Sequence, residues 1–164
     1  MSGELPRSVK LFTIWLLLGT LVFLAIQWWL RQAEQARFQT SGEAVEIRRS
    51  ADGHYHWPGR INGHAVDFLI DTGATGTAIP AALARELGLV SLGEVRSNTA
   101  GGVVTGHVVR ADIELRGGVS VQRLHVVALP QLSDDSPLLG MDVLGKLRWQ
   151  QHDAVLRIEP GTAP

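Results

Sequence analysis

The hydrophobic pattern of the chain consists of one long apolar run followed by many short ones. Residues 11–30, LFTIWLLLGTLVFLAIQWWL, carry no charged side chain. At about 1.5 Å per residue, a helix of this length spans a hydrocarbon core of about 30 Å. Beyond Asp52, short Val, Ile and Leu runs alternate with Gly-containing turns. We therefore expect a transmembrane helix followed by a mainly β domain.

The flanks of the apolar run favour an anchor that stays on the chain. Trp28 and Trp29 end the run, where indole rings prefer the headgroup region. A cleaved signal peptide, the alternative, normally has a shorter apolar region that ends in small residues. Basic residues before and after the run balance, so only the free amino terminus favours an inside N-terminus. We expect a single-pass membrane protein with its C-terminal domain across the membrane. If the source is a bacterium, that is the inner membrane with the C-terminal domain in the periplasm.

Turn residues predict where the β domain reverses its direction. The Asn-Gly pair at 62–63 predicts a hairpin with a type I′ turn, in which both central residues need positive φ. A Gly-Gly pair at 101–102 indicates the tip of a second hairpin within residues 94–115. Another Gly-Gly pair, at 117–118, marks a third turn.

Two short helices are expected between the strands. Pro80 precedes AALARELGL at 81–89, and proline favours the first turn of a helix. Pro137 precedes LLGMDVLGKL at 138–147, which we expect to be helical before a last strand at 153–159.

These elements divide the chain into five segments. The juxtamembrane segment reads as a helical continuation followed by a linker or a first short strand near AVEI. The expected segments are an N-terminal tail at 1–10, the transmembrane helix at 11–30, the juxtamembrane linker at 31–50, the β domain at 51–159 and a C-terminal tail at 160–164.

Charge and composition exclude several classes of chemistry. The net charge is −1, so no strongly basic face indicates a nucleic-acid partner. The sequence has no cysteine, which excludes disulfides, thiolate metal sites and cysteine nucleophiles. No motif indicates a cofactor, and the sequence predicts none.

In the stretch FLIDTGATG at 68–76, three apolar residues suited to a buried strand are followed directly by an aspartate and by residues typical of a turn. Asp and Gly are ordinary turn formers, so a surface turn is one interpretation of Asp71. The other is a catalytic acid held at the end of a strand. The Asp-Thr-Gly triplet alone does not decide between the two.

The surrounding sequence resembles the retropepsin-like aspartic proteases. AVDFLIDTGATGTAIP at 65–80 is similar to the active-site strand and loop of that family. PLLGMDVLGKL at 137–147 resembles its second hallmark, an apolar-apolar-Gly segment that enters a short helix. The glycine-rich hairpin at 94–110 falls where the family has its flap. The resemblance covers about 51–159 and is closest to bacterial membrane-anchored members.

The resemblance implies a fold, an activity and a set of site residues. The expected fold is a closed β-barrel of hairpins with one or two short helices, and the activity is that of an aspartic endopeptidase acting on protein or peptide substrates. Asp71 would be the catalytic residue. Thr72 would brace the loop against its counterpart, and Gly73 would let its backbone approach the carboxylate without a Cβ in the way. Ala74, a small residue, would complete the support of the loop. The expected flap residues that contact substrate are Thr99, Ala100, Gly101, Gly102 and Val103.

The chemistry of this class needs two carboxyl groups, and the chain has one Asp-Thr-Gly. Two adjacent carboxylates share a proton, so one can activate a water while the other acts as an acid. Asp67 lies four residues back in the same strand, over ~13 Å away. Asp142 reads as a solvated or capping acid. We therefore expect a homodimer with one Asp71 from each copy, favoured by the shared membrane.

Other constellations give weaker predictions. His54 and His56 share one face of a strand and could be half of a metal site, but no motif places a third ligand near them. We expect surface or packing histidines there, and no metal. Two rival functions stay open: a membrane-tethered module that binds peptides or assembles complexes without hydrolysis, and a purely structural dimerisation module. The terminal strands of a dimer interface are not obvious, and EPGTAP reads as a frayed tail.

Overall fold

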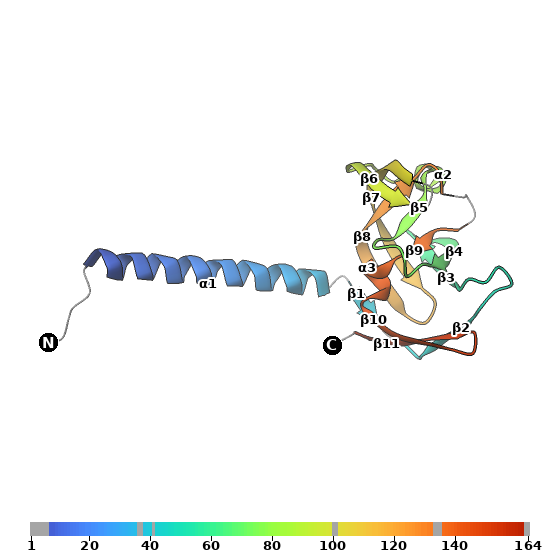
Figure 1. The fold of residues 1–164 in the computed structure, drawn as a ribbon, viewed down its shortest axis with the longest axis horizontal. Coiled ribbons are helices and arrows are strands. Elements are labelled where there is room, and N and C mark those ends of the chain that lie inside the picture. Colours follow the sequence, from blue (N-terminus) through green and yellow to red (C-terminus); the bar gives the residue numbers. More distant parts are fainter. Residues whose placement is uncertain (1–6, 36–37, 41, 100–101, 133–135, 163–164) are drawn as a thin grey trace. The chain divides into compact units, whose positions relative to one another are not determined.

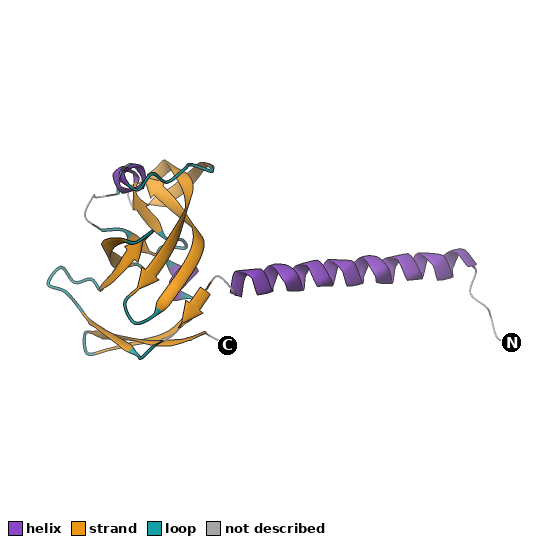
Figure 2. Ribbon diagram, turned by 180° about the vertical axis from the view of Figure 1, so that it is seen from behind, coloured by secondary structure: helices purple, strands orange, loops and turns teal. Residues whose placement is uncertain are grey.

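The computed structural model describes the chain apart from residues 1–6, 36–37, 41, 100–101, 133–135 and 163–164. The chain forms two compact units, Met1–Ala36 and Arg37–Pro164. The first contains one helix. The second is built mainly of strands (Figures 1 and 2).

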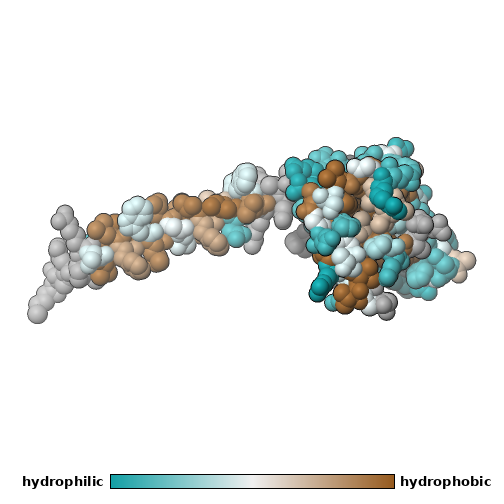
Figure 3. Space-filling view, turned by 90° about the horizontal axis from the view of Figure 1, so that it is seen from above, coloured by the Kyte–Doolittle hydropathy of each residue, from teal (hydrophilic) through white to brown (hydrophobic). Residues whose placement is uncertain are grey.

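The helix of the first unit, α1, spans Arg7–Gln35 and extends past the predicted apolar run at its C-terminal end. Its segment Ser8–Leu30 has a mean hydropathy of 2.3 and is a candidate membrane span by length and composition. Apolar side chains lie exposed along this helix (Figure 3). The hydroxyls of Thr13 and Thr20 donate to carbonyl oxygens one turn earlier, at 2.8 and 2.9 Å. The helix thus satisfies these polar groups internally, as a lipid environment requires.

The second unit has short strands and two short helices, as the sequence predicts. The strands are β1 Phe38–Thr40, β2 Val45–Arg48, β3 His56–Ile61, β4 His64–Ile70, β5 Ala78–Pro80, β6 Gly93–Thr99, β7 Gly102–Leu115, β8 Val119–Leu129, β9 Leu138–Leu139, β10 Leu147–His152 and β11 Val155–Thr162. The helices are α2 Ala81–Glu86 and α3 Met141–Leu144.

Six of these strands close a barrel. The sheet order is β1-β8-β5-β9-β4-β3-β7-β6, and β7 also pairs with β8, so the ring runs through β8, β5, β9, β4, β3 and β7. A separate three-stranded sheet has the order β10-β11-β2. It lies at one end of the unit, and the β6–β7 hairpin lies at the other (Figure 1). The predicted closed barrel with short helices is confirmed.

One hydrophobic core joins the barrel to the small sheet. Trp57, Ile61 and Phe68 of the first hairpin are completely buried. Leu156 and Ile158 of β11 pack into the same cluster, so the small sheet closes the barrel end. The indole Nε1 of Trp57 donates to the carbonyl oxygen of Arg116 at 2.9 Å, which satisfies the only polar atom of this side chain.

The hairpin predictions are confirmed by backbone geometry. Asn62 and Gly63 have φ of 48° and 83° between β3 and β4, the positive values that a type I′ turn needs. The glycines at 117–118 also have positive φ, between β7 and β8. β6 and β7 pair up to Thr99 and Gly102. Of the predicted tip pair 101–102, the second glycine begins β7, and residue 101 lies outside the described residues.

The predicted helix at 138–147 needs a correction. Leu138–Leu139 form β9, which pairs in parallel with β4, and the helix begins only at Met141. Gly140 between them is extended, with φ of −93° and ψ of −177°. The apolar pair is therefore a barrel strand rather than the start of the helix. The first helix begins at Ala81, directly after Pro80, as expected.

The C-terminal prediction also needs a correction. A further strand, β10, precedes the expected last strand, and β11 continues to Thr162, which pairs with Leu147. The turn between them uses Asp153 and Ala154 at positive φ, 45° and 61°, without a glycine to signal it. The first short strand expected near AVEI is β2, which pairs with β11. The linker region also contains β1, which pairs with β8 and was not predicted. The segments on both sides of the barrel thus form strands.

The buried indole of Trp57 gives a test of this core. We expect Trp57→Phe to lower the free energy of unfolding by about 1–3 kcal/mol, because it removes a buried hydrogen bond and leaves a void. Trp149, which is 38% exposed, is the matched control. Trp149→Phe should cost less than about 0.5 kcal/mol. Urea denaturation of the 164-residue chain in detergent micelles measures both, and equal losses would contradict the assigned core.

Candidate active site

Asp71 lies directly after β4, where the barrel backbone fixes the start of a loop. Ile70 pairs with Leu139 in the parallel β4–β9 ladder. The backbone N–H of Asp71 then donates to the carbonyl oxygen of Leu139 at 3.1 Å, and Ala74 donates back to the carbonyl oxygen of Asp71 at 3.2 Å. The apolar strand therefore ends at a partly exposed carboxyl group on a tight turn.

Gly73 orients this carboxyl group. Its backbone N–H donates to Oδ1 of Asp71 at 2.8 Å. A Cβ built on Gly73 would lie 3.2 Å from the same oxygen, so any side chain would crowd the carboxylate. Glycine here allows the amide to approach while leaving the carboxyl group open.

The far side of the loop is held by the segment that enters α3. The N–H of Met141 donates to the carbonyl oxygen of Ala74 at 2.9 Å. The backbone N–H and the hydroxyl of Thr77 both donate to the carboxylate of Asp142, at 3.0 and 2.8 Å. A Cβ on Gly140 would lie 2.4 Å from the carbonyl carbon of Gly76. The two segments therefore pack backbone on backbone, which only glycine permits.

The β6–β7 hairpin joins the barrel close to this loop. Val104 of β7 packs with Ala78 and Leu129 in a small buried cluster. Ala78 directly follows Thr77, the last loop residue. Val103, one position nearer the tip, is 67% exposed. The base of the predicted flap is thus attached beside the end of the Asp71 loop.

The structure places the predicted site residues in two groups. Asp71, Gly73 and Ala74 lie in one hydrogen-bonded turn, and the intervening Thr72 is exposed. Gly102 and Val103 lie in β7 of the hairpin, opposite Thr99 at the end of β6. The remaining predicted flap residues, Ala100 and Gly101, are outside the described residues.

No second carboxyl group is bonded to Asp71 within the described part of the chain. Asp67 contacts His56, with 3.4 Å between Oδ2 and Nδ1. Both oxygens of Asp142 accept hydrogen bonds from Thr77. The expectation of a solvated or capping Asp142 was wrong, because its partner lies 65 positions earlier. No local sequence signal indicates such a long-range contact.

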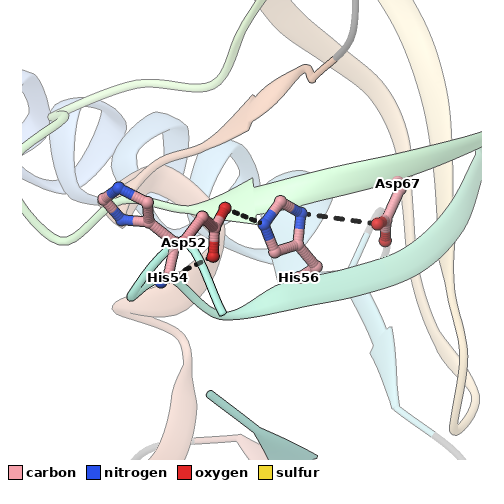
Figure 4. Close-up of polar contacts among 4 residues, drawn as sticks. All are labelled: Asp52, His54, His56 and Asp67. Carbon is pink, nitrogen blue, oxygen red and sulfur yellow. Dashed lines mark hydrogen bonds and ion pairs between the residues drawn. The ribbon is translucent and has the colours of Figure 1, made fainter. Parts of the chain in front are cut away.

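The histidines considered as metal ligands belong to a different arrangement. The ring of His56 lies between the carboxylates of Asp52 and Asp67 (Figure 4), with 2.8 Å between Nε2 and Asp52 Oδ2. The backbone N–H of His54 donates to the other oxygen of Asp52 at 3.0 Å. Across the described ranges, no three His, Asp or Glu side chains are grouped so that they could hold a metal ion. This cluster ties the turn before β3 to β4.

Comparisons with known proteins agree with this fold and loop. Residues 57–146, more than half of the chain, match the family described as "gag-polyprotein putative aspartyl protease", and the chain belongs to this family. The structure is similar to the crystal structure of a retropepsin-like aspartic protease from Rickettsia conorii, with a TM-score of 0.58 and 21% identity. The likeness covers 76% of this chain and 97% of that chain, and at this identity it shows the fold. No curated protein matches the chain.

The chain is therefore a retropepsin-like aspartic protease by family and fold, as the sequence predicts. The matched region runs from within β3 through α3 and thus contains the complete loop from Asp71 to Thr77 together with the segment that holds it.

The Asp52 contacts predict a pH dependence. The N–H of His54 and then the side chain of His56 lower the pKa of the Asp52 carboxyl below its usual 3.8. A lowered pKa contributes stability that is present above the unfolded value and is lost as the pH falls through the folded value. Above pH 3.8, we expect the free energy of unfolding of Asp52→Asn to be lower than that of the wild type. The difference should disappear as the pH falls below the lowered pKa of Asp52.

The carboxyl ¹³C shift of Asp52, followed during an acid titration, measures this pKa directly. The midpoint should lie below 3.8 in the folded chain and return to it in urea. His56→Gln should recover only part of the shift, because the His54 amide still donates. A folded midpoint at or above 3.8 would contradict the assigned contacts.

Proposed function

We propose that this chain is a membrane-anchored aspartic endopeptidase that hydrolyses peptide bonds with a pair of Asp71 carboxyl groups, one from each copy of a homodimer. The observation that carries the proposal is the Asp71 carboxyl group, oriented by Gly73 on a loop braced by β9 and α3, in a chain of this family. The chemistry requires a partly exposed carboxyl group in a fixed position, and Asp71 meets that requirement.

The mechanism uses one proton shared by two carboxyl groups. The ionised carboxyl group takes a proton from a water molecule while the oxygen of that water bonds to the carbonyl carbon of the peptide. The protonated group gives its proton to the carbonyl oxygen, which forms a tetrahedral diol. The diol then collapses, the C–N bond breaks, and the amine leaves with a proton. Two adjacent carboxyl groups repel each other when both are ionised. The pair therefore retains the single proton that these steps need.

The need for a second copy follows from the bonding of the other acids near the loop. Asp142 is committed to Thr77 and Asp67 to His56, so neither is available as the second member of the pair. A twofold axis beside Asp71 brings in the identical carboxyl group of the second copy, so the sequence needs no second catalytic aspartate. Thr72, exposed next to Asp71, is placed by this proposal at the subunit contact, where its hydroxyl would brace the partner's loop.

The β6–β7 hairpin is proposed as the flap that covers an extended peptide. Its base is attached at Val104 and Ala78, next to the end of the Asp71 loop. The exposed side chain of Val103 offers an apolar contact to an extended substrate. The further flap residues proposed to contact it are Thr99, Ala100, Gly101 and Gly102. No cofactor, metal or nucleic acid takes part in the proposal.

The apolar helix is proposed to anchor the enzyme in a bacterial inner membrane with the β domain in the periplasm. The candidate span and its internally bonded threonines support this proposal. In this scheme the span is 11–30 within α1, and the protease domain is the unit Arg37–Pro164, which includes β1 and β2 of the expected linker and the end of β11. Confinement to a bilayer raises the local concentration of copies and favours the dimer.

The role of Asp71 is tested by an isosteric change. We expect Asp71→Asn to abolish cleavage of a broad peptide library between acid and neutral pH, because the amide cannot take a proton from water. The change should leave folding and peptide binding intact. Asp153→Asn, at an exposed turn, is the matched control and should cleave like the wild type. The wild type should show a bell-shaped pH profile, since the pair must hold one proton.

The opposite outcomes have distinct meanings. Cleavage that persists in Asp71→Asn would contradict the proposed mechanism. A folded wild-type dimer that binds peptides without cutting them would instead support the rival, a non-catalytic peptide-binding or assembly module. A dimer with no peptide affinity would indicate a structural dimerisation module.

The anchor is tested by charges in the apolar helix. We expect the wild type to remain in the membrane pellet after alkaline carbonate washing and Leu17→Arg/Leu21→Arg to be released, because each central arginine costs about 2.5–3.5 kcal/mol. Leu11→Arg, at the edge of the run, is the control and should stay in the pellet, since its charge can reach the interface. Release of the wild type by carbonate would contradict the anchor, and protease resistance of the domain in spheroplasts would contradict the periplasmic orientation.

A further inference from the structure

We infer that Asp142 is a positioning residue, which holds the Asp71 carboxyl group in its reactive place by fixing Thr77 at the other end of the loop. The inference rests on the proposed function, because positioning matters only if Asp71 performs the chemistry.

The contact between Asp142 and Thr77 uses both oxygens of the carboxylate. The backbone N–H of Thr77 donates to Oδ2 at 3.0 Å, and its hydroxyl donates to Oδ1 at 2.8 Å. The same hydroxyl accepts a hydrogen bond from the N–H of Gly140 at 3.3 Å. Thr77 is completely buried. Removing the carboxylate would therefore leave two donors of this buried residue without their protein partner.

Three consecutive anchors connect this contact to Asp71. The start of the loop is bonded to Leu139, its middle at Ala74 to Met141, and its end at Thr77 to Asp142. All three anchors come from the four residues Leu139 to Asp142, which cross behind the loop. The first two use backbone atoms, so no substitution removes them directly. Asp142 supplies the only side-chain anchor of the three, and a substitution there can release the loop end.

The close packing of the two segments transmits a movement at Thr77 to Asp71. Gly140 lies against Gly76 so closely that no Cβ fits between them. The loop therefore cannot relax inward when Thr77 is released, and it must move away from α3. Such a movement would shift Gly73, whose N–H orients the Asp71 carboxyl group at 2.8 Å. A displacement of about 1 Å at a catalytic group can cost a factor of about 10² in rate.

A role in stability alone makes a different prediction. Asp142 lies in the first turn of α3, where a negative charge is favourable near the helix N-terminus. If that were its whole function, its loss would lower the unfolding temperature and leave the turnover of the folded enzyme unchanged. Measuring kcat well below the unfolding temperature therefore distinguishes the two roles: a positioning role lowers kcat, and a role in stability alone does not.

The experiment uses the 164-residue chain in detergent micelles and compares Asp142→Ala, Asp142→Asn and Thr77→Val. We expect Asp142→Ala and Thr77→Val to lower kcat by about 10–100-fold with KM within about twofold. The kcat of Asp142→Asn should lie between those of the two other variants and that of the wild type, because its single side-chain oxygen keeps one of the two bonds to Thr77. This variant also retains an acceptor for Thr77 if the alanine variant fails to fold.

The control is Asp112→Ala, which removes another carboxylate that accepts a backbone N–H, that of Arg123 at 2.7 Å. It should lower the unfolding temperature without lowering kcat. A second readout does not depend on activity: the amide NMR signal of Gly73 should shift in Asp142→Ala and stay in place in Asp112→Ala.

The results separate this inference from the proposed function. If Asp142→Ala keeps the wild-type kcat and leaves the Gly73 signal in place, the inference is overturned. If the wild type cleaves no peptide, the proposed function fails, and the Gly73 signal alone then decides whether Asp142 positions the loop.

Discussion

The structure depends on one constraint, which is that the loop from Asp71 to Thr77 is clamped against the segment from Leu139 to Asp142. Parallel pairing of β4 with β9 brings the two segments together, and Gly140 lets their backbones touch. From that point the loop has little freedom, because its start, middle and end are each hydrogen-bonded to the same short segment. A carboxyl group at the start of such a loop has a fixed position without being buried.

The clamp also explains why one copy of the chain is insufficient for the proposed chemistry. Asp142, on the segment that braces the loop, has both carboxylate oxygens bonded to Thr77, so the proposal does not use it as the partner of Asp71. In the proposed function, the site of a single chain is half of a catalytic pair. A second copy needs to bring only its own Asp71. The membrane helix, in the proposed function, makes that encounter more frequent.

Sequence patterns predicted the parts of the fold that local chemistry determines. The Asn-Gly and Gly-Gly pairs located hairpins because positive φ is a local requirement, and Asp71 followed an apolar strand that could be recognised in isolation. β9 was not predicted, because two leucines are too few for a strand pattern, and only pairing with β4 makes them one. β11 continues through Pro160 and Gly161, although both residue types usually weaken or end a strand.

The contact between Thr77 and Asp142 marks the limit of sequence reasoning at the site. Both residues lay inside the motifs that carried the family resemblance, yet their pairing depends on the crossing of two chain segments, where β5 pairs with β9 just before α3. The register of the whole barrel decides that crossing. An acid in the first turn of a predicted helix indicates a capping role from local rules alone, and tertiary structure gave it another partner.

The central claim, that each active site needs two copies of Asp71, is tested by mixing subunits. Wild-type chains are combined in micelles with an equal amount of Asp71→Asn chains, subunits are allowed to exchange, and peptide cleavage is measured at a constant amount of wild type. If random pairing forms dimers in which both carboxyl groups are required, the activity falls to about half, since half of the wild-type chains then have an inactive partner. Unchanged activity after complete exchange would contradict the account, because it would mean that a single Asp71 is sufficient.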